Sequence, residues 1–123
     1  MKEEIKTRLE TLPEQILHAQ KKLLGLIDEI EGLTEGNKQI ENSLLNEITG
    51  EKDSGDKPIY SNDTKRKLEL TRRLGVHISY KHVQTLVAEK IKDKQLLEIN
   101  IGCSKRKFRA AESFVRLGDN NGE

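Results

Sequence analysis

Side chains that could catalyse a reaction or bind a metal are few and widely spaced in this sequence. The three histidines, His18, His77 and His82, match no metal-binding motif such as HExxH. His77 and His82 are five residues apart, which directs them to different sides of a helix. The single cysteine, Cys103, can form neither an internal disulfide nor a cysteine-based zinc site. The glycines are scattered and form no phosphate-binding loop. We therefore expect no catalytic residue, no metal and no cofactor, and a protein that is not an enzyme.

Two clusters of basic residues are the other groups with recognisable chemistry. They are Lys65, Arg66, Lys67, Arg72 and Arg73, and Lys105, Arg106, Lys107, Arg109 and Arg116. Such charges neutralise phosphates in nucleic-acid complexes. The candidate nucleic-acid contacts are Lys105, Arg106, Lys107 and Arg109.

A second interpretation of the basic clusters rests on the charge asymmetry of the chain. Residues 1–62 carry 8 Lys/Arg and 13 Asp/Glu, whereas residues 63–123 carry 14 and 8. Basic side chains of the second half would then face acidic side chains of the first. We favour this interpretation, because no aromatic platform for RNA and no base-reading helix accompanies the clusters.

Composition restricts the fold class. The 123 residues correspond to a single domain, 1–123. Charged residues make up 35% of them, and two Phe, two Tyr and no Trp exclude a core built on aromatic rings. No apolar run approaches the ~18 residues of a membrane span, and the N-terminus lacks an apolar signal core. We expect an all-α, cytoplasmic protein with no membrane contact.

The first half of the chain keeps a seven-residue apolar repeat, which predicts a helix at about residues 3–49. Apolar residues at alternating spacings of three and four lie on one narrow stripe of a helix, as in a coiled-coil seam. The two seam positions are occupied by Leu9, Ile16, Leu23, Ile30, Asn37 and Leu44, and by Ile5, Leu12, Ala19, Leu26, Leu33 and Ile40.

Pro13 and Asn37 leave alternatives open in this helix. Either the main helix starts at Thr11 with Pro13 in its first turn, or it starts near Lys2 and kinks at Pro13. The unbroken phase of the repeat favours the continuous helix. Asn37 either fixes the register of the seam or merely follows Gly36 at a loosened turn. Three glycines in the helix are interpreted as points of close approach or of pliability, and they are Gly25, Gly32 and Gly36.

The segment between the two halves predicts a loop at about residues 50–61. Gly50 fits a helix C-cap. The polar stretch "EKDSGDK" is expected to be flexible and to reverse the chain, and Pro58 stiffens its return. Ser61 or Asn62 then caps the second helix. Tyr60 can fold its ring onto that helix near Leu68.

The second half predicts one helix at about residues 62–117, although its pattern is less regular. Lys90, Lys94 and Ser104 interrupt a strict seven-residue repeat, and Gly75 and Gly102 are weak points. The stretch "LLEINIG" could form a strand locally, but a lone strand would have no partner. We therefore expect the helix to continue through Gly102.

These elements predict a long antiparallel two-helix, coiled-coil-like hairpin that dimerises into a four-helix bundle. An isolated hairpin would leave several residues beside the seam in water, and pairing two hairpins would bury them at ~25 cal/mol per Å². The residues that widen the apolar stripe are Leu24, Ile27, Leu45, Ile48 and Leu86. We expect a homo-oligomer, or a hairpin that binds a partner helix. The predicted function is a non-enzymatic protein-interaction or assembly module, with a nucleic-acid-associated accessory factor as the alternative.

Two motifs resemble those of a group of small uncharacterised bacterial and phage helical-hairpin proteins. In that group a loop of the type K-P-x-Y-S-N-x-x-K-R joins two long helices, and the second helix ends in R-x-F-R-A. The matching residues here are Lys57, Pro58, Tyr60, Ser61, Asn62, Lys65 and Arg66, and Arg106, Phe108, Arg109 and Ala110. The resemblance covers about a quarter of the chain. It implies a phage or mobile-element accessory protein and no particular biochemical activity.

Overall fold

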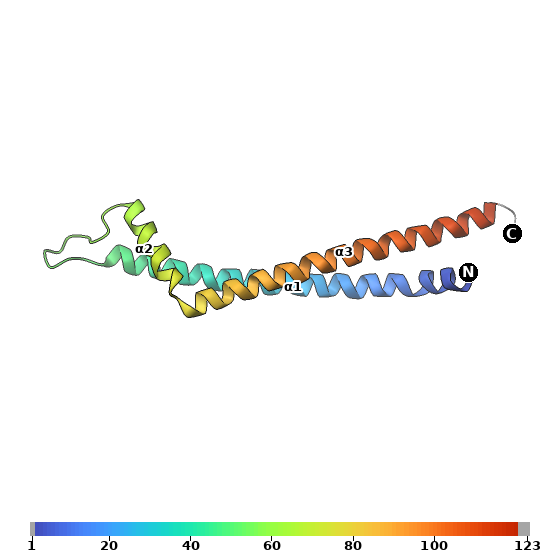
Figure 1. The fold of residues 1–123 in the computed structure, drawn as a ribbon, viewed down its shortest axis with the longest axis horizontal. Helices are drawn as coiled ribbons and strands as arrows, with labels where there is room; N and C mark the ends of the chain where they lie inside the picture. The colour runs from blue at the N-terminus through green and yellow to red at the C-terminus, as the bar shows by residue number, and fades with distance from the viewer. Residues whose placement is uncertain (1, 121–123) are drawn as a thin grey trace. The chain divides into compact units, whose positions relative to one another are not determined.

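The chain forms three helices. The structure, a computed structural model, describes residues 2–120. Its elements are α1 (Lys2–Gly50), α2 (Asp63–Gly75) and α3 (Ile78–Asn120) (Figure 1). Within these residues no strand is present, which confirms the all-α class. The contacts divide the chain into two compact units, unit 1 (Met1–Asp28 and Ile91–Glu123) and unit 2 (Glu29–Lys90).

In unit 1, α1 and α3 pack against each other in antiparallel directions. Residues 2–9 of α1 share a cleft with residues 114–118 of α3. Residues 22–26 share another with residues 93–100. Because the numbering rises along one helix as it falls along the other, this packing is that of a hairpin.

The helix α1 runs without interruption through Pro13, as the phase of the repeat predicted. It also continues through its three internal glycines. A Cβ atom added at Gly25, Gly32 or Gly36 would meet no atom within 4 Å. These glycines are therefore not points of close approach.

The predicted seam of α1 is the face that the fold covers. Leu12 and Asn37 are buried, and the other seam residues are half-buried. Of the residues beside the seam, Ile48 in unit 2 is fully buried, whereas Leu24 in unit 1 is exposed. Unit 2 also contains α2 and the loop, so more of the chain can pack against its segment of α1 than in unit 1.

The helix α3 has a seam of its own, which passes through the residues expected to interrupt it. The covered positions again alternate in steps of three and four residues. They are Tyr80, Val83, Val87, Lys90, Lys94, Leu97, Ile101, Ser104, Phe108 and Ala111. The ammonium of Lys90 pairs with Glu29, and that of Lys94 lies 3.5 Å from Glu98. Lysine can hold such a position because its alkyl stem covers apolar surface while its ammonium reaches a carboxylate or water.

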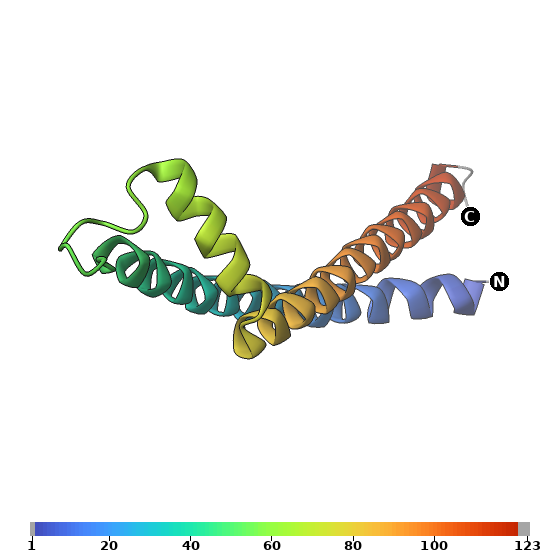
Figure 2. The same ribbon diagram turned by 60° about the vertical axis from the view of Figure 1, so that its left-hand side comes forward.

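The second half is not one helix at about 62–117, because the chain breaks at Val76 and His77. Figures 1 and 2 both show a sharp change of direction between α2 and α3. Gly75 weakens the helix at this point, and the N–H of His77 still bonds the carbonyl of Leu74 (3.2 Å). His77 then caps α3, since its Nδ1 accepts the N–H of Tyr80 at 3.0 Å. In contrast, α3 continues through Gly102 as expected.

The loop between α1 and α2 has a defined turn instead of a featureless polar connection. The Oδ1 of Asp53 accepts the N–H groups of Gly55 (2.9 Å) and Lys57 (3.0 Å). Lys52 and Pro58 form an isolated antiparallel bridge. The turn thus brings the two ends of the loop together, while α1 itself extends through Gly50.

The start of α2 is capped by one of the two candidate residues. Asn62 is the cap, and its Oδ1 accepts the N–H of Lys65 at 2.9 Å. Tyr60 is half-buried, and its carbonyl accepts a hydrogen bond from the Nε of Arg66 (3.2 Å). Leu68 remains largely exposed, so the Tyr60 ring does not cover it as the sequence suggested.

A buried polar contact joins α1 to the start of α3 in unit 2. The Nδ2 of Asn37 donates to the backbone carbonyl of Tyr80 (3.1 Å), and the Tyr80 hydroxyl bonds the Glu41 carboxylate. This contact with Glu41 raises the pKa of Tyr80, and burial adds to the shift. The Oδ1 of Asn37 has no hydrogen-bond partner among the described residues. Asn37 therefore ties α3 to the seam of α1 at the cost of one unpaired oxygen.

Ion pairs hold α2, which has no buried residue. The Nη2 of Arg73 donates to both carboxylate oxygens of Glu51 (2.8 Å each), and its Nε donates to Glu69 (2.9 Å). Arg72 also bonds Glu69. The hydrogen bonds from Arg72 and Arg73 lower the pKa of Glu69 to about 2, whereas an unperturbed glutamate titrates near 4.5. Arg73 thus links α2 to the residue that follows α1.

The lowered pKa of Glu69 predicts a specific pH dependence of stability. A carboxyl group whose pKa falls on folding stabilises the fold above its unfolded pKa, and this contribution is lost as pH drops toward the folded pKa. For Glu69 the window runs from about pH 5 down to about pH 2. Thermal melts followed by circular dichroism should show a steeper loss of Tm in this window for the native chain than for Glu69→Gln.

The matched control is Glu89→Gln, because Glu89 is exposed and forms no ion pair within residues 2–120. It should keep the pH dependence of the native chain. Equal slopes for Glu69→Gln and the native chain would contradict the assignment.

Candidate interaction surface

A second, mostly apolar stripe runs along α1 beside the seam. We define this outer stripe as Pro13, Leu17, Gln20, Leu24 and Ile27, which repeat the spacing of three and four residues. Leu17 and Leu24 are each one position after a seam residue, so they lie ~100° around the helix from it. Leu17 is 53% exposed and Leu24 is 62% exposed. Two leucines one heptad apart thus form an uncovered apolar surface in unit 1.

Polar residues bound the outer stripe at both ends. The same spacing continues through Glu10 and Lys6 toward the N-terminus, and through Glu31, Thr34 and Lys38 toward the C-terminus. All five are exposed. A short apolar centre with a polar rim is the usual anatomy of a protein–protein interface.

The outer face of α3 in unit 1 carries further exposed apolar residues. Leu96 is 61% exposed and Ile99 is 60% exposed. Cys103 is one helical turn beyond Ile99 and half-buried, and its Sγ accepts a hydrogen bond from Arg106 (3.3 Å). Unit 1 therefore exposes large apolar side chains on both of its helices.

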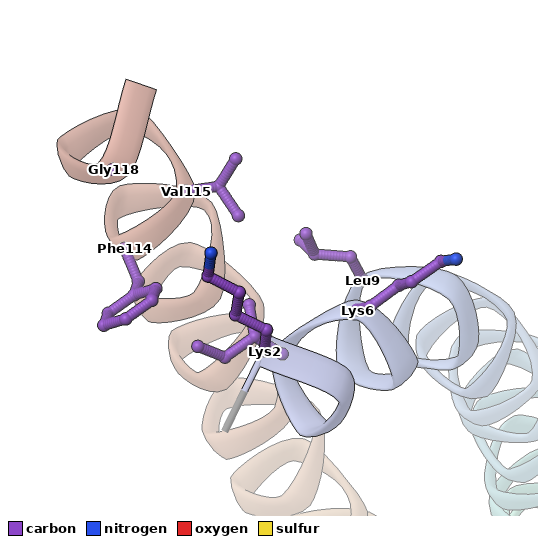
Figure 3. A pocket seen from close by; sticks show the side chains of 7 residues that line it. Lys2, Lys6, Leu9, Phe114, Val115 and Gly118 are labelled. Atoms are coloured by element: carbon purple, nitrogen blue, oxygen red, sulfur yellow. The ribbon is translucent and has the colours of Figure 1, made fainter. Parts of the chain in front are cut away.

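A cleft of about 280 Å³ lies between the start of α1 and the end of α3 in unit 1. Its residues are Lys2, Ile5, Lys6, Leu9, Phe114, Val115 and Gly118. Figure 3 shows Phe114 and Val115 on the α3 side and Leu9 on the α1 side. The Lys2 side chain extends between the two helix ends (Figure 3). Phe114 is 47% exposed, so the cleft opens to solvent.

The candidate nucleic-acid contacts are exposed on α3 in unit 1. Lys105, Arg106, Lys107 and Arg109 form no ion pair among the described residues. The expectation that basic residues of the second half face acidic residues of the first is met, within residues 2–120, only by Arg73 with Glu51 and Lys90 with Glu29. At ~100° per residue, the four side chains at 105–109 spread around more than half of the helix. They do not share one face.

Part of this surface could be predicted from the sequence. Leu24 and Ile27 were expected beside the seam, whereas Leu17, Leu96 and Ile99 were not. The signal for Leu17 was present, because the five outer-stripe residues keep one phase over about four helical turns. The cleft could not be predicted from the repeat, since it forms only where the start of α1 meets the end of α3.

Two further features of the described chain bear on function. Across residues 2–120, no group of three or more His, Cys, Asp or Glu gathers as a metal site would require. None of the described helices combines the length and apolar content needed to cross a bilayer.

Comparison of the chain with protein-family models, with curated proteins and with solved structures finds no match in any of the three.

Proposed function

We propose that the protein is a non-enzymatic helical interaction module that assembles with a second copy of itself. The observation that carries this proposal is the outer stripe of α1, which leaves Leu17 and Leu24 exposed between polar ends. Complete burial of a leucine side chain stabilises an assembly by ~1.5–3 kcal/mol. Exposed leucines in register with a seam are therefore best explained by a surface that another helix covers.

The symmetry of the outer stripe favours a second copy as that partner. Its residues lie on both sides of Gln20: Leu17 and Pro13 are three and seven positions before it, and Leu24 and Ile27 are four and seven positions after it. Antiparallel pairing of two such stripes about Gln20 sets Leu17 within about one residue of Leu24 of the second copy. The two Gln20 amides then meet at the two-fold axis, where each can both donate and accept a hydrogen bond. A self-complementary patch of this kind is what a two-fold dimer requires.

This pairing would join two hairpins of α1 and α3 into a four-helix, coiled-coil-like bundle. The exposed apolar residues of α3, Leu96 and Ile99, lie in the same unit and would add contact area. The resemblance of the loop and of the end of the second helix to small phage and mobile-element proteins is compatible with an accessory or assembly role.

The dimer predicts a clear effect of charge on the outer stripe. In Leu17→Glu/Leu24→Glu, four carboxylates would meet where leucines pack, so the dimer should dissociate. Sedimentation equilibrium should give the native chain a mass of about twice 14.0 kDa at micromolar concentration, and the variant a mass near 14.0 kDa. The matched control is Gln39→Glu/Asn46→Glu, which adds the same charges at exposed positions seven residues apart in unit 2 and should stay dimeric.

Circular dichroism should show equal helix content in all three proteins, because Leu17 and Leu24 lie outside the seam. A native chain that is monomeric at micromolar concentration would overturn the proposal. A dimer that survives both glutamates would overturn the assigned interface.

The second candidate function is that of a nucleic-acid-associated accessory factor. It rests on the exposure of Lys105, Arg106, Lys107 and Arg109 without acidic partners among the described residues. Because these four side chains spread around α3, they suit phosphates of a deep groove or of a flexible nucleic-acid strand better than phosphates on one flat face. We rank it second, because no base-reading element accompanies these residues.

A salt-titrated DNA-binding measurement separates the two functions. If binding is electrostatic, replacing Arg106, Lys107 and Arg109 with glutamine should weaken it for every sequence and reduce the salt slope by roughly two to three. Replacement of Lys21, Lys22 and Lys38, three exposed lysines of α1, is the matched control and should have a smaller effect. Unchanged affinity in the α3 variant would remove the nucleic-acid function and leave the interaction module.

A further inference from the structure

We propose that the cleft at the open end of unit 1 binds a single-chain amphiphile with an anionic head group, such as a medium-chain fatty acid. This ligand site is separate from the dimer proposed above. It lies between residues 2–9 of α1 and residues 114–118 of α3, whereas the outer stripe begins at Pro13.

The lining of the cleft favours an apolar chain. Ile5 and Leu9 come from the seam of α1, and Phe114 and Val115 come from α3. The lining of the cleft is mainly apolar, and Phe114 and Val115 keep much of their area in water. An alkyl chain placed between the helix ends would remove apolar surface from water on both sides at once.

The charge of the cleft selects the head group. The only ionisable groups among its residues are the ammonium groups of Lys2 and Lys6. Neither lysine forms an ion pair within the part of the chain that the structure describes. Lys2 extends between the two helix ends beside Val115, whereas the tip of Lys6 points away from α3 (Figure 3). An anionic head group above an apolar chain would therefore meet Lys2 first, and a cationic one would be repelled.

The size of the cleft limits the ligand. Its volume of about 280 Å³ is just below the ~300–1,000 Å³ of sites for drug-sized ligands. One short alkyl chain fits such a volume, and a two-chain lipid does not. The proposal therefore concerns a monomeric amphiphile and not a membrane surface.

The test is a titration of the full-length, ¹⁵N-labelled protein with octanoate below its micellar concentration, followed by NMR. Saturable shifts should concentrate at Ile5, Leu9, Phe114 and Val115. Octyltrimethylammonium, which has the same chain and the opposite charge, should bind roughly tenfold more weakly or not at all. Equal binding of the two amphiphiles would overturn the proposal, as would shifts that map to Leu17, Leu24 and Leu96 instead.

Two variants test the cleft itself. Lys2→Glu/Lys6→Glu should weaken octanoate binding roughly tenfold, whereas Lys21→Glu/Lys38→Glu, with the same change of charge at exposed positions, should not. Val115→Trp would fill the cleft from a partly exposed position and should abolish binding with helix content unchanged. The dimer variant Leu17→Glu/Leu24→Glu should bind octanoate like the native chain. Loss of binding there, or retained binding in Val115→Trp, would contradict the site.

Discussion

The alternation of three- and four-residue steps between covered side chains on α1 is the constraint on which the rest of the structure depends. Because of this spacing, one face of the 49-residue helix α1 packs against other elements. The covered residues of α3 must therefore follow the same alternation of three- and four-residue steps. The phase is kept even where α3 carries Lys90, Lys94 and Ser104. Lysine stems and their ion pairs substitute there for apolar side chains. In unit 1, where no further element within residues 2–120 covers α1, the apolar residues Leu17 and Leu24 outside that face are left exposed.

The seam is narrow, which also explains why polar contacts position the elements of unit 2. Only five apolar side chains among residues 2–120 are buried, and they are Leu12, Ile48, Tyr80, Ile101 and Ala111. With so small a core, position is set by directional contacts: Asn37 to the Tyr80 carbonyl, and Arg73 between Glu51 and Glu69. Such contacts add little net stability but penalise a shifted register, because a slip would leave buried polar groups unpaired.

The sequence predicted the features that repeat, and it named Asn62 as a candidate cap of α2, but it missed other features that depend on a single side chain. The repeat of α1 was strong enough to carry the helix through Pro13 and its glycines. The break between α2 and α3 was missed, because its cap is the imidazole of His77, whereas Ser, Thr, Asp and Asn are the residues expected at a cap. The turn inside the loop depends on one carboxylate, that of Asp53. The phase of α3 was obscured since lysine and serine occupy seam positions, and the cleft arises only when the two ends of unit 1 meet.

In the proposed dimer, the two copies of α1 should cross at the two-fold axis beside Gln20. The direct measurement is oxidation of Gln20→Cys in a Cys103→Ser background, read as intermolecular disulfide on a non-reducing gel. A disulfide requires Cα atoms within about 7 Å, so the symmetric pairing predicts rapid and nearly complete cross-linking. Lys38→Cys, on the same face but 18 residues away, should remain largely monomeric. Failure of Gln20→Cys to cross-link, or equal cross-linking at both positions, would contradict a dimer built on the outer stripe.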